Sequence, residues 1–250
     1  YMKQIMEEKA QNYKNGKINY VTEKVVKDST ITLTINNEIN RNLSAIEDSL
    51  EEFAVGYLFN ENMVKSIDDI EKIEINENHI NVEIDDKLLK TKETVLCSDS
   101  SGGWRSKIKE IEPISSDFQV EADELINRIE ELKNNAQIWQ ATGGTHVAGI
   151  VYKNNFIVKE DVSRHVAVDK VIGYGILHNY DLSNSYVIYS GRMPADMVIK
   201  IVRAGIPVLA SNAAPAYSGC ETAKKGNVTL VGFLRGQRFN VYNNKNRIIF

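Results

Sequence analysis

The sequence predicts an α/β protein with a smaller N-terminal α+β portion, and two observations support this class. Beyond residue 138, short apolar runs alternate with segments of helical periodicity, which is typical of strand–helix–strand units. Before that point, β-branched residues alternate in paired runs around one amphipathic helix, which indicates a small sheet covered by a helix. We therefore expect a polar lead-in over residues 1–17, the N-terminal portion over 18–120 and the larger domain over 121–250.

The N-terminal portion is predicted to combine short strands with one helix. The polar lead-in is expected to form a frayed helix or a disordered segment. A capping box at Ser49–Glu52 predicts the start of a helix that runs to about Asn60. The strands are expected at 20–26, 30–35, 70–75 and 79–84, with a turn at Asn36-Asn37 after the second of them.

The larger domain is predicted to contain a largely parallel sheet. An amphipathic helix is expected over residues 121–134, because apolar side chains recur there at helical spacing. Strands are then expected at 147–152, 186–189, 208–210 and 228–233, and helices near 166–172, 194–204 and 216–224. Such alternation favours parallel strands joined by helical crossovers.

Composition narrows the classes of protein. With 250 residues, 42% of them hydrophobic, the chain can bury a sizeable core, and it has no apolar run of the length that crosses a bilayer. The N-terminal stretch lacks the features of a signal peptide, so we expect a cytoplasmic protein. The formal net charge of −4 argues against a nucleic-acid binder. Two cysteines, Cys97 and Cys220, argue against a disulfide framework.

Positive charge is concentrated near the C-terminus. Residues 191–250 carry nine Lys or Arg against two acidic residues, which gives them +7 and leaves −11 for the rest. A solvated basic face is the simpler interpretation of this asymmetry, and a site for an anionic ligand is the more specific one.

Three predicted strand ends could form that anion site. Ligands of open α/β sheets bind beyond the carboxyl ends of the strands, where helix N-termini offer free N–H groups. Arginine binds phosphate bidentately, so a nucleotide-like ligand fits the pattern, although any single arginine could equally be a solvated surface residue. The candidates are Arg192, Ser211, Asn212, Arg235, Gly236 and Arg238.

Cysteine and histidine residues supply further candidates. Cys97 lies in the polar stretch CSDSSGG, where a structural cysteine would have little to pack against, so it is either a nucleophile or an incidental surface thiol. Cys220 lies in a predicted helix and is interpreted as structural. His146 and His165 lie beside Gly, Asp and Arg and could bind an anion or exchange protons, but a packed structural histidine is the commoner case. Without a C-x-x-C or H-E-x-x-H string, no metal site is expected.

Five blocks of the sequence are informative together: EEFAVGYLFNENMV, TGGTHVAGI, EDVSRHVAVDKVIG, SGRMPADMVIKIVRAGIPVLASNAAP and NVTLVGFLRGQRFNVY, in this order over residues 20–245. In content and order they resemble one family, the FdhD family of formate dehydrogenase accessory sulfurtransferases. The resemblance implies a cytoplasmic homodimer with a cytidine-deaminase-like, three-layer α/β/α C-terminal domain. It also implies transfer of sulfane sulfur from a cysteine desulfurase to the molybdenum cofactor, bis-molybdopterin guanine dinucleotide, before that cofactor enters formate dehydrogenase.

The same resemblance assigns roles to residues. Cys97, in the loop over 94–105, matches the cysteine that carries the persulfide. The block associated with cofactor binding comprises Phe233, Leu234, Arg235, Gly236, Gln237 and Arg238. Arg192, Ser211, Asn212, His146 and His165 are weaker candidates for the same cofactor.

Two departures from the family pattern affect these expectations. Many members carry a second cysteine in the loop, whereas Ser98, Asp99 and Ser100 follow Cys97 here, so sulfur release through a second loop thiol is excluded. Ser163 replaces the usual glycine before Arg164-His165, which argues against a left-handed backbone there.

Two rival functions remain from the sequence, and a third is rejected. A cofactor-binding chaperone without sulfur transfer would leave Cys97 incidental, and the missing second cysteine supports it. A nucleotide-binding regulator would use the arginine-rich edge alone. A zinc-dependent deaminase is suggested by the implied fold, but the chain lacks the P-C-x-x-C half of its metal site.

Overall fold

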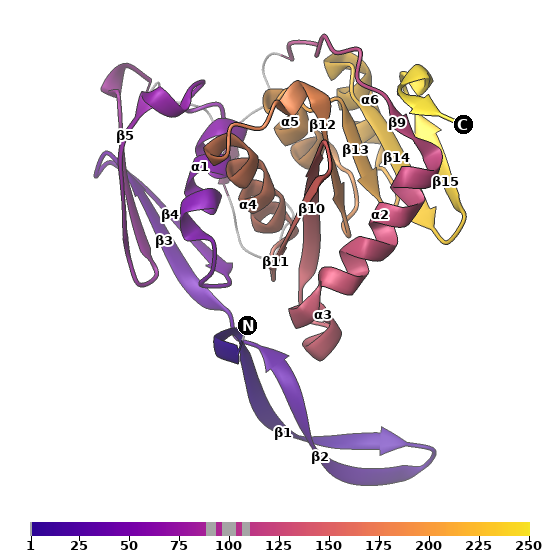
Figure 1. The fold of residues 1–250 in the computed structure, drawn as a ribbon. Coiled ribbons are helices and arrows are strands. Elements are labelled where there is room, and N and C mark those ends of the chain that lie inside the picture. Colours follow the sequence, from indigo (N-terminus) through magenta and orange to yellow (C-terminus); the bar gives the residue numbers. More distant parts are fainter. Residues whose placement is uncertain (1, 89–93, 97–103, 107–110) are drawn as a thin grey trace.

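The computed structural model describes residues 2–88, 94–96, 104–106 and 111–250. Its largest unit is a six-stranded sheet in the order β11-β10-β12-β13-β14-β15, shown in Figure 1. The strands are β10 (His146–Tyr152), β11 (Asn155–Asp161), β12 (Ser185–Tyr189), β13 (Val208–Ser211), β14 (Thr229–Arg235) and β15 (Arg238–Tyr242).

Helices cover both faces of this sheet, which confirms a three-layer α/β arrangement. On one face lie α4 (Arg164–Leu177), α5 (Ala195–Arg203) and α6 (Tyr217–Gly226). On the other lie α2 (Ala122–Asn135) and the short pair β9 (Val120–Glu121) and β16 (Ile248–Ile249). Along β12, Val187 and Tyr189 join the first core and Tyr186 and Ile188 the second, as the two-residue period of a strand requires.

The expectation of a largely parallel sheet is wrong. Only β12–β13 and β13–β14 pair in parallel, while β10–β11, β10–β12 and β14–β15 are antiparallel. Strand β11 was not expected from the sequence, and it follows β10 through the tight turn at Lys153-Asn154, where Lys153 has a φ of 54°. The sheet therefore has a parallel centre of β12, β13 and β14, and it is extended on one side by the hairpin β10–β11 and on the other by β15.

The N-terminal portion forms a second sheet in the order β4-β3-β6-β5. Its strands are β3 (Ser29–Ile35), β4 (Ile39–Ala45), β5 (Ile70–Asn76) and β6 (His79–Ile84), and the predicted hairpin 70–84 is confirmed. Helix α1 (Leu50–Asn60) covers one face of this sheet with Phe53, Tyr57 and Leu58. The expected capping box is wrong: Ser49 has a left-handed backbone, and its Oγ accepts a hydrogen bond from Lys159 Nζ at 2.6 Å.

Glycines bring the two portions together. A Cβ added to Gly56 in α1 would lie 1.9 Å from the backbone oxygen of Asp169 in α4, and one added to Gly173 would lie 1.8 Å from that of Glu52. The two helices therefore cross at backbone contact distance. Around this crossing, two fully buried ion pairs, Asp161–Lys170 and Asp169–Lys200, hold α4 to its neighbours.

The first residues form a hairpin, not the expected frayed helix or disordered lead-in. Strands β1 (Ile5–Lys14) and β2 (Lys17–Val26) pair along their whole length and are joined by Asn15-Gly16, both with positive φ. Asn-Gly is the preferred two-residue turn of such a hairpin, which explains the fold of this segment. The boundary expected at residue 17 therefore falls at the turn of the hairpin.

The remaining elements are short. Helix α3 (Gln137–Thr142) follows α2, and strands β7 (Thr94–Leu96) and β8 (Trp104–Ser106) pair with each other. Single 3-10 turns occupy Met2–Gln4, Ile67–Asp69, Asp86–Leu88, Leu182–Asn184 and Lys245–Arg247. In the part of the chain that the structure describes, no helix combines the length and apolar character needed to cross a bilayer.

Candidate anion site at the carboxyl ends of the strands

The predicted strand-end residues gather at one edge of the main sheet, here called the carboxyl edge. Because β12, β13 and β14 run in parallel, Arg192, Asn212 and Arg235 follow or end neighbouring strands on the same side. Antiparallel β10 pairs Ala148 with Tyr189, so His146 begins its strand at this edge as well. The sheet topology thus brings together side chains that are separated by nearly ninety positions in the sequence.

Ser211 joins two of the loops at the carboxyl edge. Its buried Oγ donates to the backbone oxygen of Gly191 at 2.6 Å and accepts from the backbone N–H of Ala213 at 3.0 Å. The next residue, Asn212, offers its backbone oxygen to Arg235 Nε at 2.8 Å. Ser211 therefore positions the loops, while Asn212 helps to orient an arginine.

The FLRGQR block is shaped by an irregularity in β14. Phe233 has a φ of 55°, its N–H donates to the backbone oxygen of Ala213, and the pairing with β15 shifts register between Gly232 and Arg235. Leu234 is buried in the core, whereas the other block residues are exposed or, for Phe233, half-buried. The exposed members are Arg235, Gly236, Gln237 and Arg238.

Arg235 and Arg238 lie directly opposite each other across the β14–β15 hairpin, with Gly236 in a left-handed conformation at the turn. Like charges at opposed positions of a two-stranded ladder destabilise it. A bound phosphate would remove this repulsion by accepting charge-assisted hydrogen bonds from both guanidinium groups. The hairpin tip is therefore suited to an anion.

A fourth arginine, Arg164, packs under the loop that carries exposed Arg192. A Cβ at Gly191 would lie 3.2 Å from Cδ of Arg164 and 2.6 Å from the ring of Tyr189, so the loop accepts only glycine at this close approach. The Tyr189 hydroxyl donates to the backbone oxygen of Arg192. The side chain of Arg164 thus packs against the Gly191 loop beneath the edge.

His165 and Asp196 form a pair at the N-termini of α4 and α5. His165 is fully buried, and its Nε2 lies 3.2 Å from Oδ2 of Asp196. Burial would raise the pKa of Asp196, but the hydrogen bond and charge of His165, the nearby Arg164 and the N–H of Met197 together lower it to about 2. The carboxylate therefore stays charged and fixes the histidine ring beneath the edge.

His146 is half-buried at the start of β10. Burial lowers the pKa of its imidazole, and the positive charge of Arg164 lowers it further, while Asp161 opposes both. Its Nδ1 lies 3.4 Å from Ser190 Oγ, which also accepts from the N–H of Val147 at 3.0 Å. A neutral imidazole beside Ser190 has one donor and one acceptor nitrogen, so it can either donate or accept a hydrogen bond at this edge.

Sequence reasoning missed two members of this cluster, Arg164 and Asp196. Arg164 directly precedes the predicted candidate His165, and Asp196 lies four positions after Arg192, but each faces the edge only because a helix N-terminus begins there. The prediction that Ser163 does not need a left-handed backbone is confirmed, since its φ is −100°.

The predicted nucleophile, Cys97, lies outside the described residues. Strands β7 and β8 flank its segment, with Leu96 paired to Trp104. Cys220 lies in the first turn of α6, half-buried against the hydrophobic core, as a structural residue would be. Within the described ranges, no three His, Cys, Asp or Glu side chains gather as a ligand set for a metal ion.

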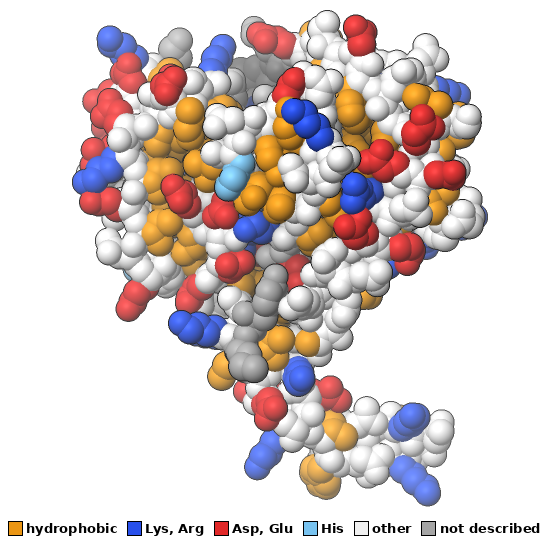
Figure 2. Space-filling view, in the orientation of Figure 1, with side chains coloured by type: hydrophobic (Ala, Val, Ile, Leu, Met, Phe, Trp, Pro, Cys, Tyr) orange, Lys and Arg blue, Asp and Glu red, His pale blue; other side chains and the backbone are white. Residues whose placement is uncertain are grey.

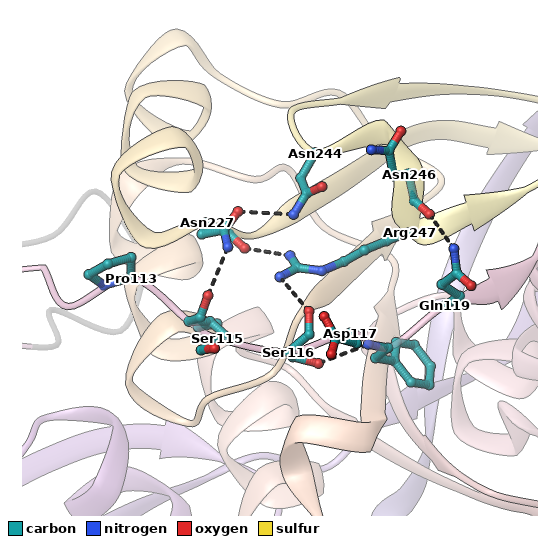
Figure 3. A pocket seen from close by; sticks show the side chains of 11 residues that line it. Pro113, Ser115, Ser116, Asp117, Gln119, Asn227, Asn244, Asn246 and Arg247 are labelled. Atoms are coloured by element: carbon teal, nitrogen blue, oxygen red, sulfur yellow. Dashed lines mark hydrogen bonds between the residues drawn. The ribbon is translucent and has the colours of Figure 1, made fainter.

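A hollow of about 670 Å³ lies elsewhere, between residues 113–119 and the last turns of the chain (Figure 3). Its buried Arg247 donates through Nη1 to the backbone oxygens of Pro207 and Asn227. Asn227 and Gln119 also bind backbone oxygens, those of Ile114 and Asn246. These groups fasten the segment before β9 to the C-terminus, so we assign the hollow a structural role.

Comparison with known proteins identifies the family. The sequence profile of the FdhD/NarQ family matches residues 26–249. This chain belongs to the FdhD/NarQ family. A sulfur carrier protein FdhD from Methanothermobacter thermautotrophicus is 48% identical over 92% of this chain and 93% of its own length. A protein FdhD from Methanocaldococcus jannaschii is 34% identical over 91% and 92%.

The fold of the family is also known from a crystal structure. A protein from Desulfotalea psychrophila, assigned as a formate dehydrogenase accessory protein, superposes with a TM-score of 0.82 at 26% identity. The match covers 98% of this chain and 100% of the other. The FdhD/NarQ fold therefore includes the N-terminal sheet as well as the six-stranded sheet.

Proposed function

We propose that this chain is a sulfur carrier that serves formate dehydrogenase, with Cys97 as the carrier thiol and the carboxyl edge as the binding surface for the recipient cofactor. Family membership and the relatives named sulfur carrier protein FdhD support the general role. The observation that carries the assignment of a binding surface is the opposed pair Arg235 and Arg238 at the tip of the β14–β15 hairpin.

The chemistry of the edge fits the proposed substrate, molybdenum bis-molybdopterin guanine dinucleotide. Its pyrophosphate groups are anions that guanidinium groups bind bidentately. Arg235 and Arg238 would hold phosphate, and Arg192 and Asn212 lie on the adjoining loops of the same edge. Phe233 offers a half-buried ring beside them, on which a guanine base could stack.

The proposed reaction at Cys97 is a thiol–persulfide exchange. The Cys97 thiolate attacks the outer sulfur of a persulfide on a cysteine desulfurase, the desulfurase cysteine leaves as a thiolate, and Cys97 becomes the persulfide. In delivery, the recipient cofactor in a reduced state or an external thiol would supply the electron pair that attacks the outer sulfur, the S–S bond would break, and Cys97 would leave as the thiolate. Because the sequence has no second loop cysteine, attack by the recipient or an external thiol must release this sulfur.

The proposed setting follows from the same role. We place the carrier in the cytoplasm, between a cysteine desulfurase and apo-formate dehydrogenase, and we expect a homodimer. Neither nucleic acid nor membrane is required by this chemistry. The second candidate, a cofactor chaperone without sulfur transfer, is favoured by the sequence CSDS, which lacks the second thiol.

Intact mass spectrometry tests the proposal. Wild type, Cys97→Ser and Cys220→Ser would be incubated with a cysteine desulfurase and cysteine, then measured with and without reductant. We expect a reducible gain of one sulfur atom in the wild type and in Cys220→Ser, and no gain in Cys97→Ser. A gain that survives in Cys97→Ser, or no gain from an active donor, would overturn the carrier assignment and favour the chaperone.

A further inference from the structure

The N-terminus of α4 lies at the carboxyl edge. Strand β11 ends at Asp161, which pairs with His146, so α4 begins on the same side of the sheet as the loops after β12 and β13. The helix has 14 residues, and the N–H groups of a first helical turn have no acceptor inside the helix and favour anions. The side chains around this end decide whether it can bind one.

Two buried donors lie at this helix end without a hydrogen-bond partner. Ser163, the N-cap residue, is 6% exposed, and its Oγ has no partner among the described residues. The side chain of an N-cap residue lies beside the N–H groups of the first turn. In the same part of the chain, Arg164 Nε is likewise buried and has no partner. Buried polar groups are normally hydrogen-bonded, so these two donors indicate a missing acceptor.

The carboxylate whose pKa Arg164 helps to lower does not supply this acceptor. Asp196 Oδ2 lies 3.2 Å from His165 Nε2, and its Oδ1 accepts from the N–H of Met197 at 3.0 Å. The charge of Arg164 also acts on His146, since burial and this charge together lower the pKa of the imidazole. An incoming anion would therefore meet a positive charge without having to displace Asp196.

The tip of the β14–β15 hairpin lies too far away to share one pyrophosphate with this helix end. Arg164 packs beneath Gly191, which follows β12, whereas Arg235 ends β14, and β13 lies between these strands. Two strand spacings amount to about 10 Å. The two phosphorus atoms of a pyrophosphate share one oxygen, so a single pyrophosphate cannot reach both places.

We propose that the N-terminus of α4 is a second anion subsite of the carboxyl edge, in which Ser163 Oγ and Arg164 Nε donate hydrogen bonds to a phosphate group. On the face shown in Figure 2, basic and acidic side chains are interspersed, so a local set of donors and not a broad basic surface would select the anion. The inference rests on the proposed function only in placing this phosphate on the same edge as the hairpin tip.

A titration with inorganic phosphate, followed by ³¹P NMR, tests the subsite. The parent protein is Arg235→Ala/Arg238→Ala, so that the hairpin tip does not contribute. We expect this parent to bind phosphate, and we expect added Ser163→Ala to raise the dissociation constant about tenfold, as loss of one hydrogen bond to a charged group does. Arg164→Lys should weaken binding to a similar extent, because an ammonium group cannot replace Nε of the guanidinium.

Thermal unfolding separates a binding role from a structural one. Ser163→Ala removes a hydroxyl that has no partner in the folded protein, so the melting temperature without phosphate should not fall. Ser44→Ala on the N-terminal sheet is the control: its hydroxyl donates to Asp28, and its loss should leave phosphate binding unchanged. No phosphate binding by the parent, or equal binding after Ser163→Ala, would overturn the subsite.

GDP distinguishes a nucleotide phosphate from a free ion. With the hairpin tip intact, weaker GDP binding by Ser163→Ala would assign the subsite to a phosphate of the nucleotide. An effect on inorganic phosphate alone would assign it to the free ion. GDP binding that is insensitive to Arg235→Ala/Arg238→Ala would contradict the proposed function, whereas phosphate binding that depends on Ser163 would still support this subsite.

Discussion

Charged side chains form ion pairs in the interior of this molecule, whereas like charges face each other at its carboxyl edge. Asp161 and Lys170 are fully buried with Nζ 2.8 Å from Oδ2, and Asp161 also accepts from the N–H of Ile46, which leads into α1. Arg235 and Arg238, by contrast, are exposed and face each other. The interior pairs satisfy each charge within the fold, whereas we propose that the exposed charges of the edge bind a ligand.

This contrast separates residues that hold the structure from residues that we propose for function. Asp169 accepts from Lys200 Nζ at 2.5 Å and from Asn60 Nδ2 at 2.6 Å, so three helices meet on one carboxylate. Loss of an interior charge should therefore destabilise the fold. Loss of an edge arginine should leave the fold intact and weaken binding.

The largest effect is expected from Lys170→Met. Removing one member of a buried ion pair leaves an uncompensated charge, and the free energy of unfolding should fall by about 3–5 kcal/mol. Urea denaturation of the wild type and the variant measures this. Asp161→Asn/Lys170→Met should recover part of the loss, because the amide oxygen can still accept from one of the two backbone N–H groups, those of Ile46 and Ser163, that the carboxylate accepts from. A single variant as stable as the wild type would show that the pair is dispensable.

The next effect concerns binding alone. GDP is a suitable ligand because it carries the guanosine and pyrophosphate groups of the proposed cofactor. For Arg235→Ala/Arg238→Ala we expect the dissociation constant of GDP to rise at least about tenfold. One hydrogen bond to a charged group contributes roughly 1.5–3 kcal/mol. Isothermal titration calorimetry gives the constant. Lys225→Ala/Lys245→Ala is the matched control, and equal weakening in both double variants would indicate a general charge effect.

Gly56→Ala tests the helix crossing that joins the two portions. Alanine normally stabilises a helix relative to glycine, but here its Cβ would meet the backbone of Asp169, so we expect a loss of about 1–3 kcal/mol. Thermal or urea unfolding followed by circular dichroism measures the sign. A stabilised variant would mean that α1 and α4 lie further apart than the structure places them.

The smallest effect is the pH dependence from Asp196. Its pKa is lowered from 3.8 to about 2, so the carboxylate stabilises the fold above pH 3.8, and this contribution is lost as the pH falls through 2. Because the group is partly exposed, we expect about 1 kcal/mol between the wild type and Asp196→Asn at pH 6, declining toward pH 2. A stability difference that does not change with pH would contradict the assignment.

Much of this architecture could be predicted from local sequence. The hairpin over 70–84, the amphipathic helix after Glu121 and the strands near 147–152 and 208–210 each have a periodicity that matches their burial. The strand ends were predicted to meet because parallel strands share an edge, and Arg192, Asn212 and Arg235 do follow such strands.

What could not be predicted depends on partners distant in sequence. Asn15-Gly16 is a local signal for a hairpin turn, but the flanking residues are too polar to indicate a buried strand, so the hairpin was not predicted. The Ser49 hydroxyl, which was expected to cap α1, instead accepts a hydrogen bond from Lys159, and only the tertiary structure brings these two residues together. Strand β11 was not predicted because Lys159 and Glu160 interrupt its apolar pattern. In the structure Lys159 binds Glu52 of α1, and Glu160 accepts from the N–H of Ile138 in α3.

Transfer of labelled sulfur tests the central claim most directly. The protein would be loaded with ³⁵S from cysteine by a desulfurase, separated from the donor, and mixed with the molybdenum cofactor. We predict that the wild type passes its label to the cofactor, that Cys97→Ser never acquires it, and that Arg235→Ala/Arg238→Ala acquires the label but delivers it slowly. Loading without Cys97, or delivery by the arginine variant at the wild-type rate, would contradict a carrier that works between one thiol and the carboxyl edge.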